Sequence, residues 1–175
     1  MNEKDAINLL RKSGCSPAVI EHCKVVAAHA REIALDIKRH SITKGVMVEI
    51  DIDMVYTGGL LHDMGRSRTH GIFHAVEGAR IALENGLDEK IVNIIERHIG
   101  AGIPEDEAVA IGLPAKDYMP LTLEEKIVAH ADNLVSGARV GSLDELVSGL
   151  KDKKLDNKII RRIIELNNEI CALRN

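Results

Sequence analysis

The stretch GGLLHDMGRSRTH, residues 58–70, carries an apolar segment directly into an adjacent imidazole and carboxylate. The residues at 59–61 favour the protein interior, and they are expected to draw His62 and Asp63 out of water with them. Desolvating such a pair is costly unless each group has a partner. Either the two side chains satisfy each other in a structural hydrogen bond, or they face a cation in a cleft.

Both flanks of this stretch follow the helical period. Ser16 and Pro17 provide an N-cap and a first-turn proline for the helix that follows, whose apolar residues recur on one face. Only VMVEIDID, residues 46–53, favours a short strand. The predicted class is all-α, with helices over residues 3–14, 18–40, 51–65, 74–86, 87–100, 123–138, 142–150 and 156–173.

Composition agrees with a helical core and limits the function. Hydrophobic residues make up 45% and charged residues 29%, as in ordinary globular proteins, and with one Phe, two Tyr and no Trp the core must be built from aliphatic side chains. The net charge of -4 disfavours general nucleic-acid binding, which needs a basic surface. A small phosphorylated substrate held by one or two cations stays compatible with this charge.

Length and cysteine usage indicate one intracellular domain. A chain of 175 residues is typical of a single domain, and we expect residues 139–175 to form a C-terminal helical extension of it. Three widely spaced cysteines favour a reducing cytoplasm. The sequence has neither a signal-peptide pattern nor an apolar stretch of the ~20 residues that span a membrane. The apolar side of the last helix either packs back on the core or supports a homodimer.

Histidine and aspartate residues recur near the expected helix ends, in the order H…HD…H…H…D. Imidazole and carboxylate together suit zinc, iron, manganese or nickel rather than calcium, which prefers oxygen alone. Each residue by itself is more often structural, but their joint order favours a metal site. The six residues are His22, His62, Asp63, His74, His98 and Asp132.

Three other histidines fit this site less well. His29 lies two helical turns from His22, about 10 Å away. His130 precedes Asp132 by two residues, about 200° around the helix, and should face elsewhere. His70 lies in a loop, and we expect it at the rim of the pocket, where it touches substrate.

The ordered residues resemble the HD-domain phosphohydrolase superfamily. HDMG at 62–65 is similar to the common HD-[IV]-G form, HAVEGA at 74–79 to an H-x-x-x-G-A helix start, and HADNLV at 130–135 to the terminal A-D element. The resemblance covers residues 18–138. The run from RHIGAGI to HADNLV also resembles a small archaeal branch that names no substrate.

This resemblance implies an HD-domain helical bundle that holds one or two divalent metals. Mononuclear members of the family use the residues that match His22, His62, Asp63 and Asp132. Dinuclear members add two histidines, which match His74 and His98. We therefore expect two divalent ions, drawn from Fe, Mn, Zn, Ni or Co.

The resemblance also implies hydrolysis of a phosphoester by a metal-activated water. Asp63 would bridge or orient the metals. Many dinuclear members have Lys where this chain has Arg66, which either holds the phosphate bidentately or forms a surface ion pair. The loop 99–120 is expected to close over the site, with Lys116 as a second phosphate contact or as a solvated lysine.

The expected substrate is a nucleotide or another small phosphorylated metabolite. The nearest enzymatic alternative is a phosphodiesterase acting on a small cyclic phosphodiester. A different class is a metal-bound ligand sensor without turnover, which loss of a ligand position would favour, and none is lost. A purely structural interaction protein would not gather six metal-type ligands at helix ends.

Overall fold

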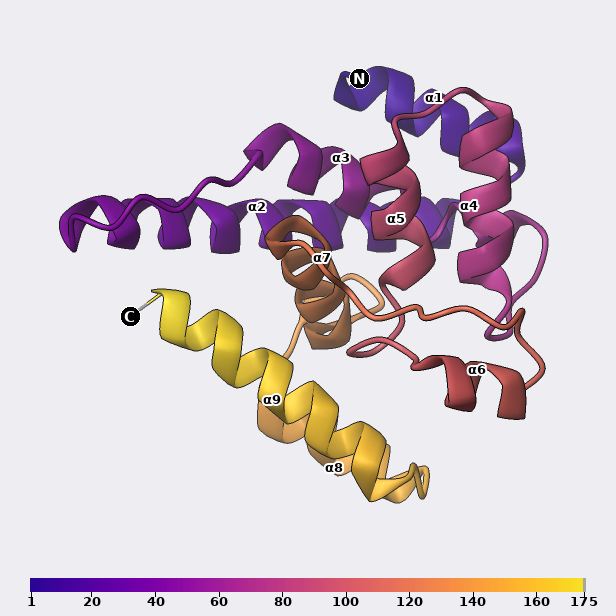
Figure 1. Cartoon of the computed structure of the whole chain (residues 1–175). Helices are drawn as coiled ribbons and strands as arrows, with labels where there is room; N and C mark the ends of the chain where they lie inside the picture. Colours follow the sequence, from indigo (N-terminus) through magenta and orange to yellow (C-terminus); the bar gives the residue numbers. More distant parts are fainter. Residues whose placement is uncertain (175) are drawn as a thin grey trace.

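A computed structural model describes residues 1–174 of the chain (Figure 1). These residues form nine α-helices, one 3-10 helix and one two-stranded antiparallel hairpin, which confirms the predicted all-α class. The elements are α1 (Glu3–Ser13), α2 (Pro17–Thr43), α3 (Ile52–Leu61), η1 (Met64–Ser67), α4 (His74–Glu84), α5 (Glu89–Arg97), α6 (Glu105–Ala110), α7 (Leu123–Leu134), β1 (Val135–Ser136), β2 (Arg139–Val140), α8 (Leu143–Asp152) and α9 (Asn157–Arg174).

The long helix α2 is the element on which the others assemble. Its start follows the sequence signal, because the Ser16 hydroxyl accepts a hydrogen bond from the Val19 amide at 3.3 Å and Pro17 occupies the first turn. Helices α3, α7 and α9 pack on α2, α5 packs on α3 and α7, and α4 packs on α5 and η1. The aliphatic core lies between these helices.

Two glycines let α3 approach its neighbours closely. A Cβ at Gly59 would lie 2.8 Å from the Ala27 Cα of α2, and one at Gly58 would lie 2.7 Å from a methyl group of Ile94 on α5. A side chain at either position would overlap these atoms, so the close approach of the helices depends on glycine. The end of α3, with His62 and Asp63, is thereby seated between α2 and α5.

The prediction of a strand over 46–53 is wrong. Residues 46–51 have no regular structure, and the Asp51 carboxylate caps α3 by accepting a hydrogen bond from the Met54 amide at 2.9 Å. This cap recruits residues 52 and 53 into the helix. The helix predicted over 123–138 instead ends at Leu134 and gives way to the β1–β2 hairpin.

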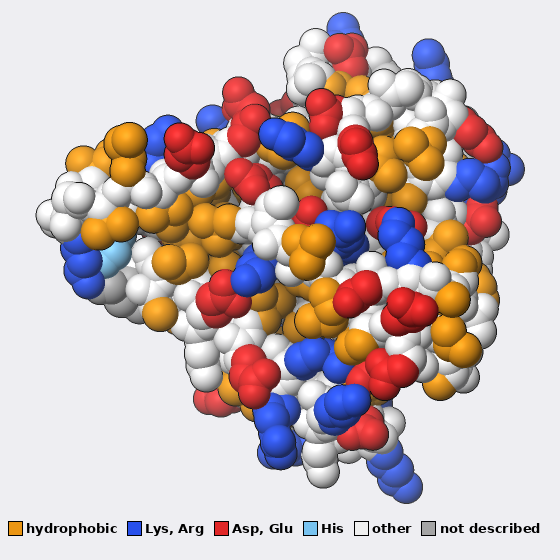
Figure 2. Space-filling model, in the orientation of Figure 1, with side chains coloured by type: hydrophobic (Ala, Val, Ile, Leu, Met, Phe, Trp, Pro, Cys, Tyr) orange, Lys and Arg blue, Asp and Glu red, His pale blue; other side chains and the backbone are white. Residues whose placement is uncertain are grey.

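The C-terminal helix α9 packs back on the core, the first of the two alternatives. Its residues Ile160, Ile163, Leu166 and Ile170 are buried, and α9 contacts α7 and α2. On the face shown in Figure 2 basic and acidic side chains are interspersed, and hydrophobic ones are exposed at the projecting end of α2. No helix within residues 1–174 combines the length and apolarity needed to cross a bilayer.

Candidate metal centre

The structure brings all six predicted ligand side chains together from the ends of five helices. His22 lies early in α2, His62 caps the end of α3, and Asp63 precedes η1. His74 begins α4, His98 caps the end of α5, and Asp132 lies in the last turn of α7. Within residues 1–174 these side chains include two groups close enough to hold an ion. We name His22, His62 and Asp132 the outer group, and His62, Asp63 and His98 the inner group.

Gly65 allows the turn after Asp63 to lie against α4. A Cβ at this position would come within 1.9 Å of the His74 carbonyl oxygen and 2.4 Å of the Gly78 amide nitrogen. The sequence pattern predicts that Gly65 ends the buried helix, but α3 ends at Leu61 and Gly65 lies inside η1. The glycine serves close packing of the two backbones that carry Asp63 and His74.

All four imidazoles of the centre hold Nδ1 against a backbone carbonyl. A carbonyl oxygen can only accept, so in each neutral ring Nδ1 carries the proton and Nε2 keeps its lone pair. In three of the four the carbonyl belongs to the residue three positions earlier. The pairs are His62 with Gly59 at 2.8 Å, His74 with Gly71 at 2.7 Å, His98 with Ile95 at 2.7 Å, and His22 with Gly137 at 3.0 Å.

The Nε2 atoms face one another and the two carboxylates. Nε2 of His74 lies 3.0 Å from Nε2 of His98, and Asp63 Oδ1 lies 3.1 Å from the former and 3.6 Å from the latter. Lone pairs and an anionic oxygen at these distances repel each other unless a positive charge lies among them. The arrangement therefore calls for a cation or for extra protons.

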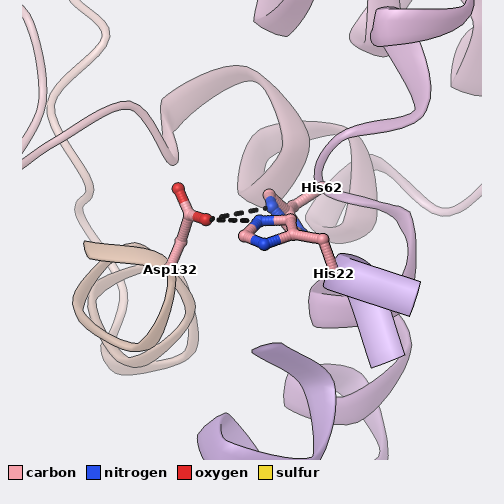
Figure 3. Close-up of side chains that lie close together, drawn as sticks. All are labelled: His22, His62 and Asp132. Atoms are coloured by element: carbon pink, nitrogen blue, oxygen red, sulfur yellow. Dashed lines mark hydrogen bonds and ion pairs between the residues drawn. The ribbon is translucent and has the colours of Figure 1, made fainter. Parts of the chain in front are cut away.

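The outer group converges on one oxygen of Asp132 (Figure 3). Oδ1 of Asp132 lies 2.9 Å from His22 Nε2 and 3.3 Å from His62 Nε2. The second oxygen of Asp63 lies 3.8 Å from each of the same two nitrogens. Asp63 thus presents Oδ1 toward His74 and His98 and Oδ2 toward the outer group.

Burial makes this donor set expensive without a cation. The side chains of His62 and Asp63 are 0% and 4% exposed, and His62 Nε2 and Asp63 Oδ1 have no hydrogen-bond partner. A buried polar atom without a partner is destabilising. The residues present therefore fit a divalent cation of the kind that accepts nitrogen and oxygen ligands.

The charges of the centre point the same way. Burial opposes ionisation of Asp63 and Asp132, but His62 and the neighbouring histidines hold the pKa of both carboxyls well below the usual range. Burial disfavours the protonated form of His62, yet Asp63 and Asp132 raise its pKa. Burial and the neighbouring imidazoles lower the pKa of His98. Two ionised carboxylates buried beside imidazole nitrogens favour a bound cation.

Arg66 is tied to the centre through Asp63. Its Nε donates to Asp63 Oδ2 at 2.5 Å, and its Nη1 donates to the His70 carbonyl at 3.4 Å. His70 is exposed, and its contact with Arg66 uses the backbone carbonyl. The guanidinium thus holds the carboxylate, and phosphate binding by Arg66 and substrate contact by the His70 imidazole stay predictions.

The segment 99–120 leaves the centre directly after His98 and contains the short helix α6. The Asn133 amide donates to the Gly100 carbonyl at 2.8 Å, and Glu107 of α6 pairs with Arg162 of α9 at 2.6 Å. The Lys116 ammonium pairs with Glu96 and lies 5.9 Å from the centre of the Tyr118 ring. A phosphate contact by Lys116 stays a prediction.

The histidines set aside by spacing do not join the two groups. His130 is buried, and burial, with the nearby His29 as a smaller cause, lowers its pKa to about 4. Sequence reasoning missed the carbonyls that orient the imidazoles. A signal exists for two of them, because a glycine stands three residues before His62 and before His74. No local signal links His22 to Gly137.

Comparisons with known proteins place this geometry in context. The family model described as HD domain matches residues 19–137. The uncharacterized protein MJ0778 of Methanocaldococcus jannaschii is 52% identical over 175 residues, 99% of each chain. A tRNA (cytidine(56)-2'-O)-methyltransferase of Thermoplasma volcanium is 42% identical over 156 residues, which are 89% of this chain but 43% of that enzyme.

A solved structure shares the fold. The crystal structure of the L. monocytogenes phosphodiesterase PgpH HD domain in complex with cyclic-di-AMP aligns with a TM-score of 0.53 and 16% sequence identity. The alignment covers 97% of this chain and 95% of that one. At this identity the likeness concerns the arrangement of the helices.

Proposed function

The chain belongs to the HD domain family, and on that premise we propose that it is a metal-dependent phosphohydrolase acting on a phosphoester of a nucleotide or another small phosphorylated metabolite. One observation carries the proposal. Four imidazoles with anchored Nδ1 atoms turn Nε2 toward two ionised carboxylates, and two of these inward atoms are buried without a partner.

The donor set supports two cation positions that share Asp63. Asp63, His74 and His98 would hold one ion, and His22, His62 and Asp132, together with the second oxygen of Asp63, would hold the other. Their nitrogen and oxygen donors suit Fe, Mn, Zn, Ni or Co. A divalent ion bound there supplies Lewis acidity toward phosphoryl oxygens and lowers the pKa of water.

The chain's own residues supply orientation and charge. The carbonyls behind the imidazoles fix the ring tautomers, which raises the basicity of Nε2. Arg66 fixes Asp63 and places a permanent positive charge beside it. Negative charge on a phosphoryl group that enters from the Arg66 side would be stabilised there.

A phosphodiesterase acting on a small cyclic phosphodiester is the second candidate. The observation that favours it is the likeness to the PgpH HD domain, whose structure was solved with cyclic-di-AMP. Hydrolysis of a diester and of a monoester needs the same stabilised phosphoryl charge, so the centre suits both.

The experiment is a metal analysis joined to a phosphoester screen. Protein purified without a histidine tag is compared with His74→Ala and Asp63→Ala, and with His130→Gln as a buried histidine outside the centre. We expect about two ions per chain, a loss on His74→Ala, near-complete loss on Asp63→Ala and no change in His130→Gln. The screen offers nucleoside monophosphates, other small phosphomonoesters and cyclic phosphodiesters.

Three results separate the alternatives. Hydrolysis that disappears with the ions supports the enzyme, and the substrate class decides between monoesterase and diesterase. Bound ions without hydrolysis of any phosphoester would favour a sensor. No bound ion, with a normally folded Asp63→Ala variant, would make the His62-Asp63 pair structural and end the proposal.

A further inference from the structure

His22 is oriented differently from the other three histidines of the centre. His62, His74 and His98 bond to carbonyls of their own turns, three residues earlier. His22 Nδ1 bonds to the carbonyl of Gly137, 115 residues away in the chain. The direction of Nε2 in His22 therefore depends on a distant segment.

That segment is the turn of the β1–β2 hairpin. Val135 pairs with Val140 and Ser136 with Arg139, so Gly137 and Ala138 form a two-residue turn. At the open end of the hairpin, the Gly141 amide after β2 donates to the carbonyl of Leu134, just before β1, at 2.7 Å. Gly137 has φ +61, a conformation that two-residue hairpin turns require and that glycine adopts without strain.

The hairpin is supported from the C-terminal part of the chain. Arg139 pairs with Glu145 at 3.2 Å, and Glu145 with Ser142 forms the capping box of α8. Both pair members are largely exposed, and a hollow of about 310 Å³ lies between the hairpin and α8. The partner strand and α8 follow residue 137, where the match to the HD domain model ends.

The two groups of the centre also differ in exposure. In the outer group His22 and Asp132 are 16% and 22% exposed, whereas in the inner group Asp63 and His98 are 4% and 1% exposed. The inner donors are fixed within their own turns and sealed from water. In the outer group His22 and Asp132 are partly exposed while His62 is buried, and His22 takes its orientation from a small surface hairpin.

We propose that the β1–β2 hairpin is the positioning element for His22, so that the outer group is complete only while the Gly137 carbonyl holds the imidazole. Cation binding by the outer group then depends on the hairpin, while the inner group binds independently of it. The cation part rests on the proposed function. The orientation of His22 is a property of the metal-free chain and does not.

Substitutions of Gly137 test the role of the hairpin without introducing a steric clash. A Cβ at Gly137 would meet no atom within 4 Å, so Gly137→Val acts through the positive φ alone. Gly137→Asn is the conservative variant, because Asn tolerates this conformation. Gly45→Val is the matched control: Gly45 has φ +68, equally open space, and lies beyond the far end of α2 from His22.

The first readout is the tautomer of His22 in metal-free protein. Side-chain ¹H–¹⁵N correlation spectra are recorded at about pH 8, above the ordinary pKa of histidine. We expect a hydrogen-bonded Nδ1–H on His22 in the wild type, Gly137→Asn and Gly45→Val, and its loss in Gly137→Val alone. Retention in Gly137→Val, or an equal loss in Gly45→Val, would overturn the proposal.

The second readout is equilibrium binding of Mn²⁺. We expect Gly137→Val to weaken one of two binding steps about 10–100-fold and to leave the other unchanged. Equal weakening of both steps, or of neither, would contradict the division into inner and outer groups. If no variant binds Mn²⁺, the proposed function fails, and the tautomer spectra still decide whether the hairpin orients His22.

Discussion

Asp63 and Arg66 are joined by a 2.5 Å hydrogen bond from the guanidinium Nε to carboxylate Oδ2. Oδ1 of the same carboxylate faces His74 and His98. Asp63 therefore faces the inner group with Oδ1 and is held by the Arg66 guanidinium through Oδ2. The contact that Arg66 makes in the structure is thus with the carboxylate of Asp63.

Replacement of Arg66 is expected to impair turnover more than ion binding. Arg66→Ala should lower kcat/KM for the phosphoester found in the screen about 10–100-fold, since Asp63 loses its orienting partner. Arg66→Lys should restore little, because an ammonium lacks the planar fork that meets the carboxylate. Arg80→Ala, which removes a surface guanidinium on α4, is the control. Unchanged kinetics in Arg66→Ala would remove Arg66 from the site.

Gly65 is expected to tolerate no side chain. Gly65→Ala places a Cβ against the His74 carbonyl and should lower the free energy of unfolding by about 3 kcal/mol. Gly71→Ala meets no atom within 4 Å and should change stability by less than about 0.5 kcal/mol. Urea denaturation of both variants measures the difference. Similar stabilities would show that η1 and α4 can separate at little cost.

Cation binding should stabilise the fold. An ion that binds the folded chain alone adds about 2.7 kcal/mol at 100 times its Kd, which corresponds to a rise in Tm of roughly 5–10 °C at this size. The rise with Mn²⁺ should vanish in Asp63→Ala and persist in Asp152→Ala, which removes an exposed carboxylate at the end of α8. Thermal unfolding with and without Mn²⁺ gives both values. An equal rise in Asp63→Ala would indicate binding elsewhere.

Acid should loosen the attachment of α6 to α9. Hydrogen bonds from Arg162, with Lys158 as a smaller cause, lower the pKa of Glu107 from 4.5 to about 2 against the opposing effect of burial. Because the folded pKa is depressed, this stabilisation is present above pH 4.5 and is lost as pH falls toward 2. Glu107→Gln should therefore lower the free energy of unfolding by about 1 kcal/mol at neutral pH and by almost nothing near pH 2.

The control for this pH dependence is Glu105→Gln, an exposed residue at the start of the same helix. Denaturant unfolding of the three proteins across this range isolates the contribution of Glu107 from that of the other carboxylates. A stability difference for Glu107→Gln that does not shrink with falling pH would contradict the assignment.

The sequence predicts the donors of the centre because their chemistry is local. The type and order of the residues from His22 to Asp132 indicate the cluster, and Ser16 with Pro17 indicates where α2 begins. The strand predicted over 46–53 is wrong because the residues of that stretch do not by themselves reveal that Asp51 caps a helix. The hairpin escapes prediction because its strands have two residues each, too short for any period to show.

The hydrogen bonds that orient the imidazoles are likewise predictable only where the two partners are close in the sequence. Gly59 and Gly71 precede their histidines by three residues, so a helical turn suffices to connect them. The bond between His22 and Gly137 exists only after α7 has packed on α2 and the chain has reversed behind Asp132. The two partners are 115 positions apart, so no local sequence pattern predicts this hydrogen bond.

Orientation by main-chain carbonyls has a consequence for divergence. A carbonyl survives every substitution of the residue that carries it, so the tautomers of His62, His74 and His98 cannot be lost by replacing a partner side chain. Descendants of such a chain can exchange the residues that surround the reacting group and adopt new substrates, while the three nitrogens keep their aim. The orientation of these three imidazoles is thus inherited as backbone geometry, whereas the orientation of His22 depends on a hairpin that is distant in the sequence.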